Sequence, residues 1–269
     1  MRLFINNPVS YRVKYEDIGL RDYKEVWDYQ KSLFNCLAEE KKNNERGKSE
    51  LNKSVPGTLI FVEHPHVYTL GKNGSENNLL INQIQMRAKN VAFYRTDRGG
   101  DITYHGPGQI VAYPVFDLEE VGISLKEYIY RLEEAVIRTM SVFGLKGERL
   151  AGTPGVWLNA DNNTKARKIC AIGVKASRYI TMHGFAFNIN TELDYFNYIN
   201  PCGFTDKGVT SLQKETGIRQ DMKEVKKYLL DKLKDIFDLK FINDISDGEK
   251  MGSEREGRPG CCAGAGKSS

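Results

Sequence analysis

The chain has 269 residues, of which 40% are hydrophobic and 28% are charged, as in an ordinary globular protein. Lysine and arginine exceed aspartate and glutamate by only 39 − 35 = 4, which argues against nucleic-acid binding unless the basic residues are clustered. The N-terminal sequence lacks the apolar core of a signal peptide, and no apolar run approaches the ~18 residues of a membrane span. We therefore expect a soluble, cytoplasmic protein with no nucleic-acid or membrane partner.

Residue spacing predicts the elements of the first half of the chain. Alternation over 10–16 predicts a strand, and apolar residues at helical spacing predict a helix over 21–38. The charged stretch 39–54 is expected to be a helix end followed by a solvated loop. Further strands are predicted at 58–63, 66–71, 90–97 and 109–118, with a weakly helical segment at 78–88.

The second half begins with the clearest helix, 125–143. Ser124 and Glu127 are placed to form a capping box, and Gly144 ends the helix. Strands follow at 155–159, 168–177 and 181–190, and Asp221 opens a last helix over 222–237. Strands dominate and helices flank them, so the fold class is α/β or α+β with a mixed sheet. We expect one domain over residues 1–246, followed by a disordered tail, 247–269, which has too few large apolar residues to form a core.

Three segments are candidates for chemistry. The first is RGGDITYHGPGQ at 98–109, where four glycines allow a backbone to approach a ligand closely. The same composition would also serve a tight loop with no ligand. It is neither a Walker loop nor a dinucleotide fingerprint, because no Gly-Lys-Ser/Thr follows and the next residues continue as a strand.

The second and third segments each carry one reactive residue. Lys168 begins an apolar strand, where burial would favour its neutral, basic form, although an outward-pointing lysine is the simpler interpretation. Cys202 lies between Pro201 and Gly203 on a turn, outside any apolar run, so it is a candidate nucleophile. Cys170 lies within an apolar strand and is expected to be a core thiol, although it shares a strand face with Lys168.

The other cysteines and two histidines give weaker signals. The five cysteines (36, 170, 202, 261 and 262) are odd in number and include no CxxC pair, so no disulfide framework, zinc site or thioredoxin-like motif is predicted. His64 and His66 form an H-P-H pair without a third ligand nearby, so no metal site is predicted there.

RGGDITYHGPGQ, KICAIG, HGFAFNIN and NPCG, in this order, resemble the motifs of the lipoyl (octanoyl) transferase family. The similarity extends from about residue 63 to residue 212. It implies an α/β domain like that of the biotin and lipoate ligases, with a mixed sheet and flanking helices. By the motif match, Cys202 is the acyl-thioester nucleophile and Lys168 lowers the pKa of its thiol.

The resemblance also implies the substrate-binding residues. They are Arg98, Gly99, Gly100, Asp101, Ile102, Thr103, Tyr104 and His105 in the first motif, Ala171, Ile172 and Gly173 in the second, and Gly184, Phe185 and Ala186 in the third. His183, next to the third motif, is expected either to line the acyl pocket or to fix a strand by hydrogen bonds.

The implied reaction takes an octanoyl group from octanoyl-acyl carrier protein, through a cysteine thioester, to a lysine of a lipoyl domain. The acceptor would be the E2 component of a 2-oxoacid dehydrogenase or the glycine cleavage H protein. Neither ATP nor a metal or other cofactor is expected, because a thiolate exchanges with a thioester at little cost in free energy. The alternatives are an ATP-dependent lipoate or biotin protein ligase, which would not need Cys202, and a non-catalytic relative that binds lipoyl domains.

Overall fold

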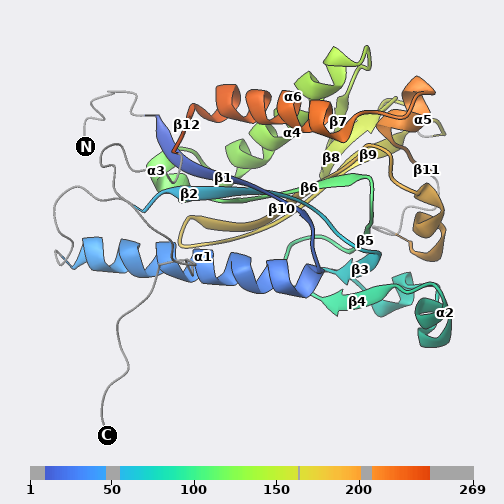
Figure 1. Ribbon diagram of the computed structural model, residues 1–269, viewed down its shortest axis with the longest axis horizontal. Coiled ribbons are helices and arrows are strands. Elements are labelled where there is room, and N and C mark those ends of the chain that lie inside the picture. The colour runs from blue at the N-terminus through green and yellow to red at the C-terminus, as the bar shows by residue number, and fades with distance from the viewer. Residues whose placement is uncertain (1–9, 47–54, 163, 201–207, 243–269) are drawn as a thin grey trace, which may run out of the picture.

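The computed structural model describes residues 10–46, 55–162, 164–200 and 208–242. Within them, nine strands form one large mixed sheet in the order β12-β1-β2-β6-β10-β9-β8-β7, with β11 beside β9 (Figure 1). The strands are β1 (Tyr11–Leu20), β2 (Gly57–Glu63), β6 (Gln109–Val115), β7 (Glu148–Leu150), β8 (Thr153–Leu158), β9 (Arg167–Ser177), β10 (Ile180–Asn188), β11 (Gly208–Val209) and β12 (Leu239–Phe241). β1 runs parallel to β2 and β12, and the central strands β2, β6, β10, β9 and β8 pair antiparallel.

A second, three-stranded sheet lies at one end of the large sheet, in the order β4-β3-β5. Its strands are β3 (Val67–Leu70), β4 (Ala92–Arg95) and β5 (Ile102–His105). The short helices η1 (Glu76–Asn78), α2 (Gln83–Ala88) and η2 (Leu193–Tyr198) lie around it. Because β2 and β3 are separated only by residues 64–66, the chain passes from one sheet to the other at Pro65.

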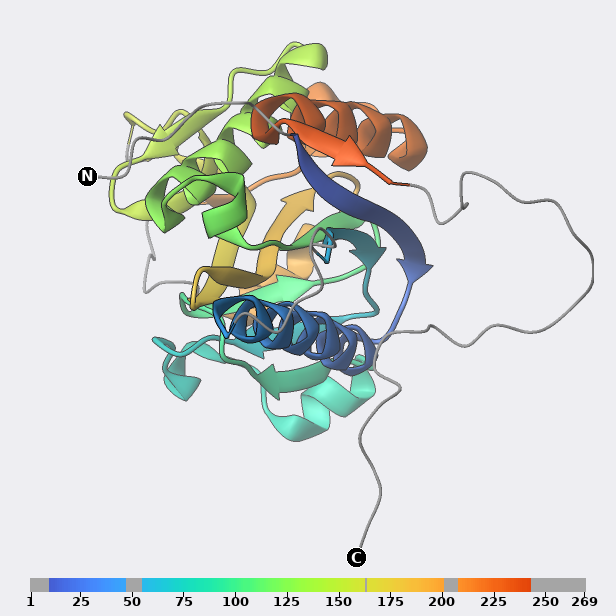
Figure 2. The ribbon, with the colours of Figure 1, turned by 90° about the vertical axis from the view of Figure 1, so that its left-hand side faces the viewer.

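Helices cover both faces of the large sheet (Figures 1 and 2). α4 (Leu125–Val142) and α6 (Met222–Phe237) lie on one face and α1 (Tyr23–Glu45) on the other. Successive side chains of β2 point alternately to these two faces. Leu59 and Phe61 pack in the core beneath α4 and α6, whereas Ile60 and Val62 pack with Val26 of α1. Burial on both faces explains why β2 and β6 are continuous apolar runs.

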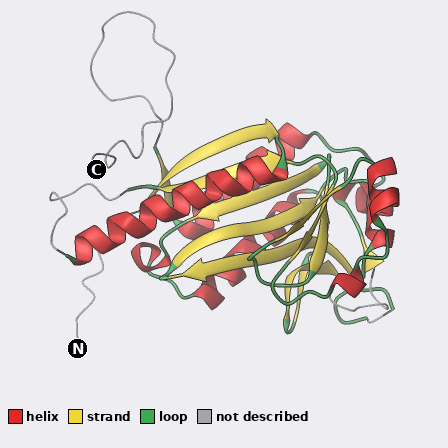
Figure 3. Cartoon of the chain, turned by 90° about the horizontal axis from the view of Figure 1, so that it is seen from below, coloured by secondary structure: helices red, strands yellow, loops and turns green. Residues whose placement is uncertain are grey.

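α1 is longer than the sequence predicted and crosses the large sheet in Figure 3. The charged residues after 38 continue the helix to Glu45 instead of ending it. Lys41 explains part of this extension, because its ammonium reaches Asp117 at 3.0 Å and Glu119 at 2.7 Å across the interface with α3 (Leu118–Val121). The helix thus ends within 39–54 as expected, seven residues beyond the predicted boundary at 38, and residues 47–54 lie outside the described residues.

The predicted helices at 125–143 and 222–237 are confirmed as α4 and α6. Ser124 caps α4 by accepting a hydrogen bond from the Glu127 amide at 3.2 Å. The Glu127 carboxylate instead accepts a hydrogen bond from Arg131 at 2.8 Å, so the expected capping box is only half formed. Asp221 caps α6 as predicted. The short elements β7, β11, β12, α3 and α5 (Leu212–Thr216) were not predicted.

The glycine-rich segment 98–109 is also more regular than expected. Residues 102–105 form β5 and pair antiparallel with β3, with Val67 opposite His105 and Thr69 opposite Thr103. The loop proper is therefore residues 96–101, between β4 and β5.

The predicted fold class, a mixed α/β sheet with flanking helices, is confirmed. The end of the predicted domain at 246 and the tail 247–269, with Cys261 and Cys262, lie outside the described residues. None of the described helices combines the length and the apolar character needed to cross a membrane.

Candidate active site

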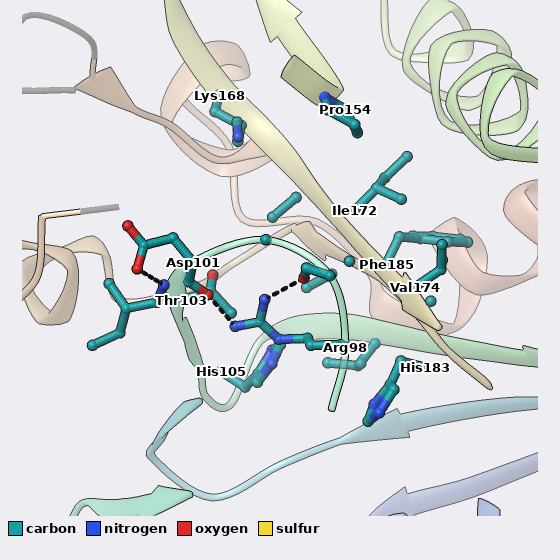
Figure 4. Close-up of a pocket in the computed structure, with 18 of the residues that line it drawn as sticks. Arg98, Asp101, Thr103, His105, Pro154, Lys168, Ile172, Val174, His183 and Phe185 are labelled. Carbon is teal, nitrogen blue, oxygen red and sulfur yellow. Dashed lines mark hydrogen bonds between the residues drawn. The ribbon is translucent and has the colours of Figure 1, made fainter. Parts of the chain in front are cut away.

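A cavity of about 540 Å³ is lined by residues of both sheets (Figure 4). Its walls include the predicted Lys168 and His183 and almost all of the predicted substrate-binding residues. These are Arg98, Gly99, Gly100, Asp101, Ile102, Thr103, His105, Ala171, Ile172, Gly173, Gly184, Phe185 and Ala186. Three segments far apart in the sequence thus meet around one space.

Tyr104 is the predicted substrate-binding residue that does not line this cavity. Successive residues of a strand point to opposite faces, so Thr103 and His105 face the cavity and Tyr104 points away. Its ring is fully buried in the core of the small sheet, where it stacks on Tyr195 with ring centroids 5.0 Å apart. Its hydroxyl lies 2.7 Å from Nδ1 of His66. Tyr104 therefore packs in the core of the small sheet and not in the cavity wall, and its predicted part in substrate binding stays a prediction.

Arg98 organises the glycine-rich loop from within. Its guanidinium donates to the carbonyl oxygen of Thr69 at 2.6 Å, to that of Asp101 at 2.7 Å and to that of Gly99 at 3.0 Å. The side chain is only 7% exposed, so these bonds to carbonyl groups satisfy a charge that would otherwise be costly to bury. Arg98 thus fixes the loop that forms one wall of the cavity.

The opposite wall depends on glycines that let strands and loop touch. A Cβ at Gly184 would lie 2.0 Å from the carbonyl oxygen of Ala112 on β6. A Cβ at Gly173 would lie 3.0 Å from the carbonyl oxygen of Gly99. The loop therefore rests directly on the backbone of β9, and larger side chains at these positions would force the walls apart.

His105 belongs to a buried chain of hydrogen bonds beneath the loop. Its Nδ1 lies 2.8 Å from Oε1 of Gln109, and the Gln109 amide nitrogen donates to Oδ1 of Asn188 at 2.8 Å. Since a carbonyl oxygen only accepts, Nδ1 carries the proton and Nε2 faces Thr69 Oγ1 at 3.5 Å. Burial lowers the pKa of His105 to about 3, so the imidazole is neutral.

His183 lies between the cavity and the loop 96–101, and its predicted place in an acyl pocket stays a prediction. Its imidazole lines the cavity, and Nε2 lies 2.7 Å from Oδ1 of Asp97. Burial lowers the pKa of His183 despite this carboxylate, so a neutral ring donates from Nε2 to Asp97. Its backbone has φ +61°, unusual for a residue other than glycine. Among the described residues, the buried Nδ1 has no hydrogen-bond partner.

Lys168 reaches the cavity from β9 (Figure 4) and is half-buried. Its Nζ lies 4.6 Å from the centroid of the Trp157 ring, a cation–π distance. Val209 of β11 pairs with Lys168 and also lines the cavity. The simpler interpretation, a lysine that points out into solvent, does not hold.

The cysteines divide as follows. Cys170 is fully buried in the core beneath α4 and α6, as predicted, and burial, followed by the negative charge of Glu133, raises the pKa of its thiol. Cys36 is half-buried on α1. Cys202 lies at 201–207, outside the described residues, but the chain on both sides of this segment, Phe196 and Val209, lines the cavity.

The H-P-H pair is accounted for by contacts within the fold. Nδ1 of His64 lies 2.8 Å from the carbonyl oxygen of Arg21 and Nε2 lies 2.9 Å from the Tyr113 hydroxyl, while His66 stacks on Tyr195 at 4.2 Å. Within the part of the chain that the structure describes, no three His, Cys, Asp or Glu side chains gather as metal ligands would.

Several cavity residues were not predicted from the sequence. Two of them, Gln109 and Asn188, belong to the motifs RGGDITYHGPGQ and HGFAFNIN, and the others lie outside the matched motifs: Tyr23, Val111, Tyr113, Leu125, Ile129, Gly152, Thr153, Pro154, Val174, Phe196 and Val209. Gly152 lies in the turn before β8, and Thr153 and Pro154 begin that strand, where no sequence pattern pointed to a site. The others were hidden because they are ordinary apolar or amide residues of helices and strands.

Residues 22–234 match the family described as the lipoyl protein ligase A/B catalytic domain. The chain belongs to this family. The octanoyltransferase of Parabacteroides distasonis is 53% identical over 224 residues, which cover 83% of this chain and 98% of that protein. The octanoyltransferase of Cytophaga hutchinsonii is 50% identical over 229 residues, which cover 85% of this chain and 93% of that protein. The resemblance seen in the motifs is therefore confirmed.

The fold of the family agrees with solved structures. A bipartite lipoate protein ligase from Thermoplasma acidophilum has a TM-score of 0.60 at 14% identity, covering 88% of each chain. At this identity the similarity concerns the fold alone. The present chain therefore shares with this ligase a mixed sheet with flanking helices.

Proposed function

We propose that this chain is an octanoyltransferase of protein lipoylation. It takes octanoyl from octanoyl-acyl carrier protein, holds it as a thioester on Cys202 and passes it to a lysine of a lipoyl domain. One observation carries the proposal: Lys168, residues 98–103 and His105 of the first motif, and residues 171–173 and 184–186 line a single cavity. The octanoyltransferases that share about half of its sequence support the reaction.

Lys168 supplies the proton transfers in this proposal. As an ammonium it stabilises the Cys202 thiolate, which attacks the thioester carbonyl of the donor. Lys168 then gives its proton to the departing thiolate of the carrier protein. The neutral Lys168 next accepts a proton from the attacking lysine amine, the amide forms, and Cys202 leaves as a thiolate beside the restored ammonium. The first step exchanges one thioester for another and the second converts a thioester into a more stable amide, so the route needs neither ATP nor a metal.

The position of Lys168 supports this role. It is half-buried beside the face of Trp157, and Val209, on the C-terminal side of the segment that holds Cys202, pairs with it. Among the described residues, Cys170 is a thiol close to Lys168, but its buried, neutral state makes it a poor nucleophile.

The acceptor in the proposal is the lipoyl domain of a 2-oxoacid dehydrogenase E2 component or the glycine cleavage H protein. The archaeal lipoylation system of Thermoplasma acidophilum comprises a lipoate protein ligase and its E2 lipoyl domain, which supports an acceptor of this kind. The acyl carrier protein as donor rests on the motif resemblance.

The test is ATP-free incubation with octanoyl-acyl carrier protein, followed by intact-mass analysis. Wild type and Cys170→Ala should each gain one octanoyl group that hydroxylamine removes, and added lipoyl domain should then become octanoylated. Cys202→Ala should gain none. Loading of Cys202→Ala but not of Cys170→Ala would reassign the nucleophile. Product that forms only from free octanoate and ATP would make the chain a ligase instead.

A further inference from the structure

Asp97, which precedes the first motif, joins the glycine-rich loop to the large sheet. Its Oδ1 lies 2.7 Å from Nε2 of His183 on β10, and its Oδ2 lies 2.6 Å from Nζ of Lys175 on β9. The carboxylate thus accepts hydrogen bonds from two strands that face the cavity. Asp97 itself does not line the cavity and was not singled out by its sequence.

The loop 96–101 is bonded much more extensively to the small sheet. The Thr96 amide donates to Leu70 at 2.8 Å, and Arg98 donates to Thr69. The amides of Gly71 and Lys72 donate to Asp101 and Arg98, respectively. The loop is therefore attached mainly to the small sheet.

Bonds to the large sheet are concentrated on residues 173–175 of β9 and on His183. The Gly99 amide donates to the Val174 carbonyl at 2.9 Å, next to Gly173, on whose backbone the loop rests. Lys175 follows directly and pairs with Asp97. Because the loop forms one wall of the cavity and Ile172, Val174 and Phe185 belong to the other, these bonds join the two walls.

The backbone of His183 is consistent with a position shaped for this contact. Its φ of +61° occurs within strand β10, where an extended backbone is the rule. The strain is held in place by a hydrogen bond from its amide to Oε1 of Gln30 at 2.9 Å. Strained residues of this kind persist where the surrounding structure fixes them and are frequent at functional sites.

We propose that Asp97, bound by His183 and Lys175, is a positioning residue that fixes the width of the cavity and thereby its selectivity for medium-length acyl chains. The substrate in this statement rests on the proposed octanoyltransferase function, whereas the positioning of the loop does not. Without the carboxylate, the loop keeps its bonds to the small sheet and loosens from β9 and β10. A looser wall contacts an octanoyl chain less closely and admits longer chains.

The test compares Asp97→Ala with Asp97→Asn, Lys175→Met and a matched control, Glu76→Ala. Asp97→Asn keeps an acceptor for His183 but loses the charge that binds Lys175. Glu76→Ala removes an ion pair with Arg95 beside the same loop, without touching the large sheet. Far-ultraviolet circular dichroism and the unfolding temperature establish that each variant is folded. If Asp97→Ala does not fold, Asp97→Asn and Lys175→Met provide the test.

Hydrogen exchange is the readout that does not depend on catalysis. We expect faster exchange over residues 97–103 in Asp97→Ala, a smaller effect in Asp97→Asn and Lys175→Met, and no effect in Glu76→Ala. In acyl transfer, Asp97→Ala should raise the KM for octanoyl-acyl carrier protein and lower the preference for octanoyl over dodecanoyl, each by about tenfold, with a smaller change in kcat.

Unchanged exchange at 97–103, or unchanged acyl selectivity in an active variant, would overturn the proposal. A fall in kcat with an unaltered KM and selectivity would do the same, because it would place Asp97 in the chemical step. If the wild type transfers no octanoyl, the proposed function fails while the exchange measurement still decides whether Asp97 holds the loop.

Discussion

Acidification should destabilise this protein well above the pH at which its carboxylates titrate. Burial lowers the pKa of His64 to about 4 and that of His105 to about 3. An unfolded histidine has a pKa of about 6.5. Both imidazoles are therefore neutral in the folded protein at pH 5, whereas the unfolded chain has taken up a proton on each.

The hydrogen bonds of the two rings explain why protonation is unfavourable. In His64, Nδ1 donates to the Arg21 carbonyl, so Nε2 accepts from the Tyr113 hydroxyl. In His105, Nδ1 donates to Gln109 and Nε2 faces Thr69. A second proton on either ring would occupy the accepting nitrogen inside the core.

The sign and size of this pH effect on stability follow from the linkage between proton binding and folding. Above pH 6.5 the two histidines are neutral in both the folded and the unfolded protein, and the free energy of unfolding has its full value. Below it, each histidine lowers the free energy of unfolding by about 1.4 kcal/mol per pH unit until its folded pKa is reached. Between pH 7 and pH 5 the loss is about 2 kcal/mol for each ring and about 4 kcal/mol for the two. That is a large part of the 5–15 kcal/mol typical of a domain.

Urea unfolding at pH 7, 6 and 5, followed by circular dichroism, measures this loss. His105→Gln should reduce the slope of the free energy of unfolding against pH by about half. The control His66→Gln should change it less, because His66 lies nearer the surface and stacks on Tyr195. A free energy of unfolding that changes by less than about 1 kcal/mol between pH 7 and pH 5 would refute the reasoning, since it is below the loss expected from one ring alone.

Three further predictions concern the walls of the cavity and the strand β8 beside them. Gly184→Ala should destabilise the protein by about 1–3 kcal/mol and slow acyl loading, because the added Cβ would lie 2.0 Å from the Ala112 carbonyl oxygen. An unchanged unfolding midpoint in urea would contradict this. Gly155→Ala should destabilise the protein by a similar amount, about 1–3 kcal/mol, because φ is +134° and the added Cβ would lie 2.5 Å from the Cys170 carbonyl oxygen. Thermal unfolding measures the effect, and an unfolding temperature equal to that of the wild type would argue against it. Lys168→Met should lower kcat for octanoyl transfer about 10²–10⁴-fold while keeping the fold; steady-state transfer to a lipoyl domain measures it, and near wild-type turnover would remove Lys168 from the mechanism.

Local signals predicted the parts of the fold that form within one stretch of chain. α4 is an example, because Ser124, the apolar spacing and Gly144 all lie within its own sequence. Elements that depend on distant partners were missed. β5 is hidden in a glycine-rich segment and becomes a strand only by pairing with β3, and β12 is fixed by pairing with β1 from the other end of the described chain.

The candidate site shows the same division. Contiguous motifs named most of the cavity residues, but a motif includes every residue in its run and ignores the alternation of a strand. Tyr104 was included for that reason, although its ring faces the core of the small sheet. Asp97, Tyr23 and Val209 reach the site or its walls through tertiary contacts alone, so no spacing in the sequence pointed to them.

The surroundings of Cys170 bear directly on which thiol can react. It lies two residues from Lys168 on the same strand, and the lysine charge acts to lower its pKa, but burial and the carboxylate of Glu133 outweigh that charge. The Glu133 carboxylate is held in place by the Gly155 amide and by Arg149, each at 3.0 Å. A thiol in this position stays protonated, and the core packed around it excludes an acyl chain. Lys168 lines the cavity instead, so the proposed mechanism requires a thiolate that approaches the lysine from the cavity side.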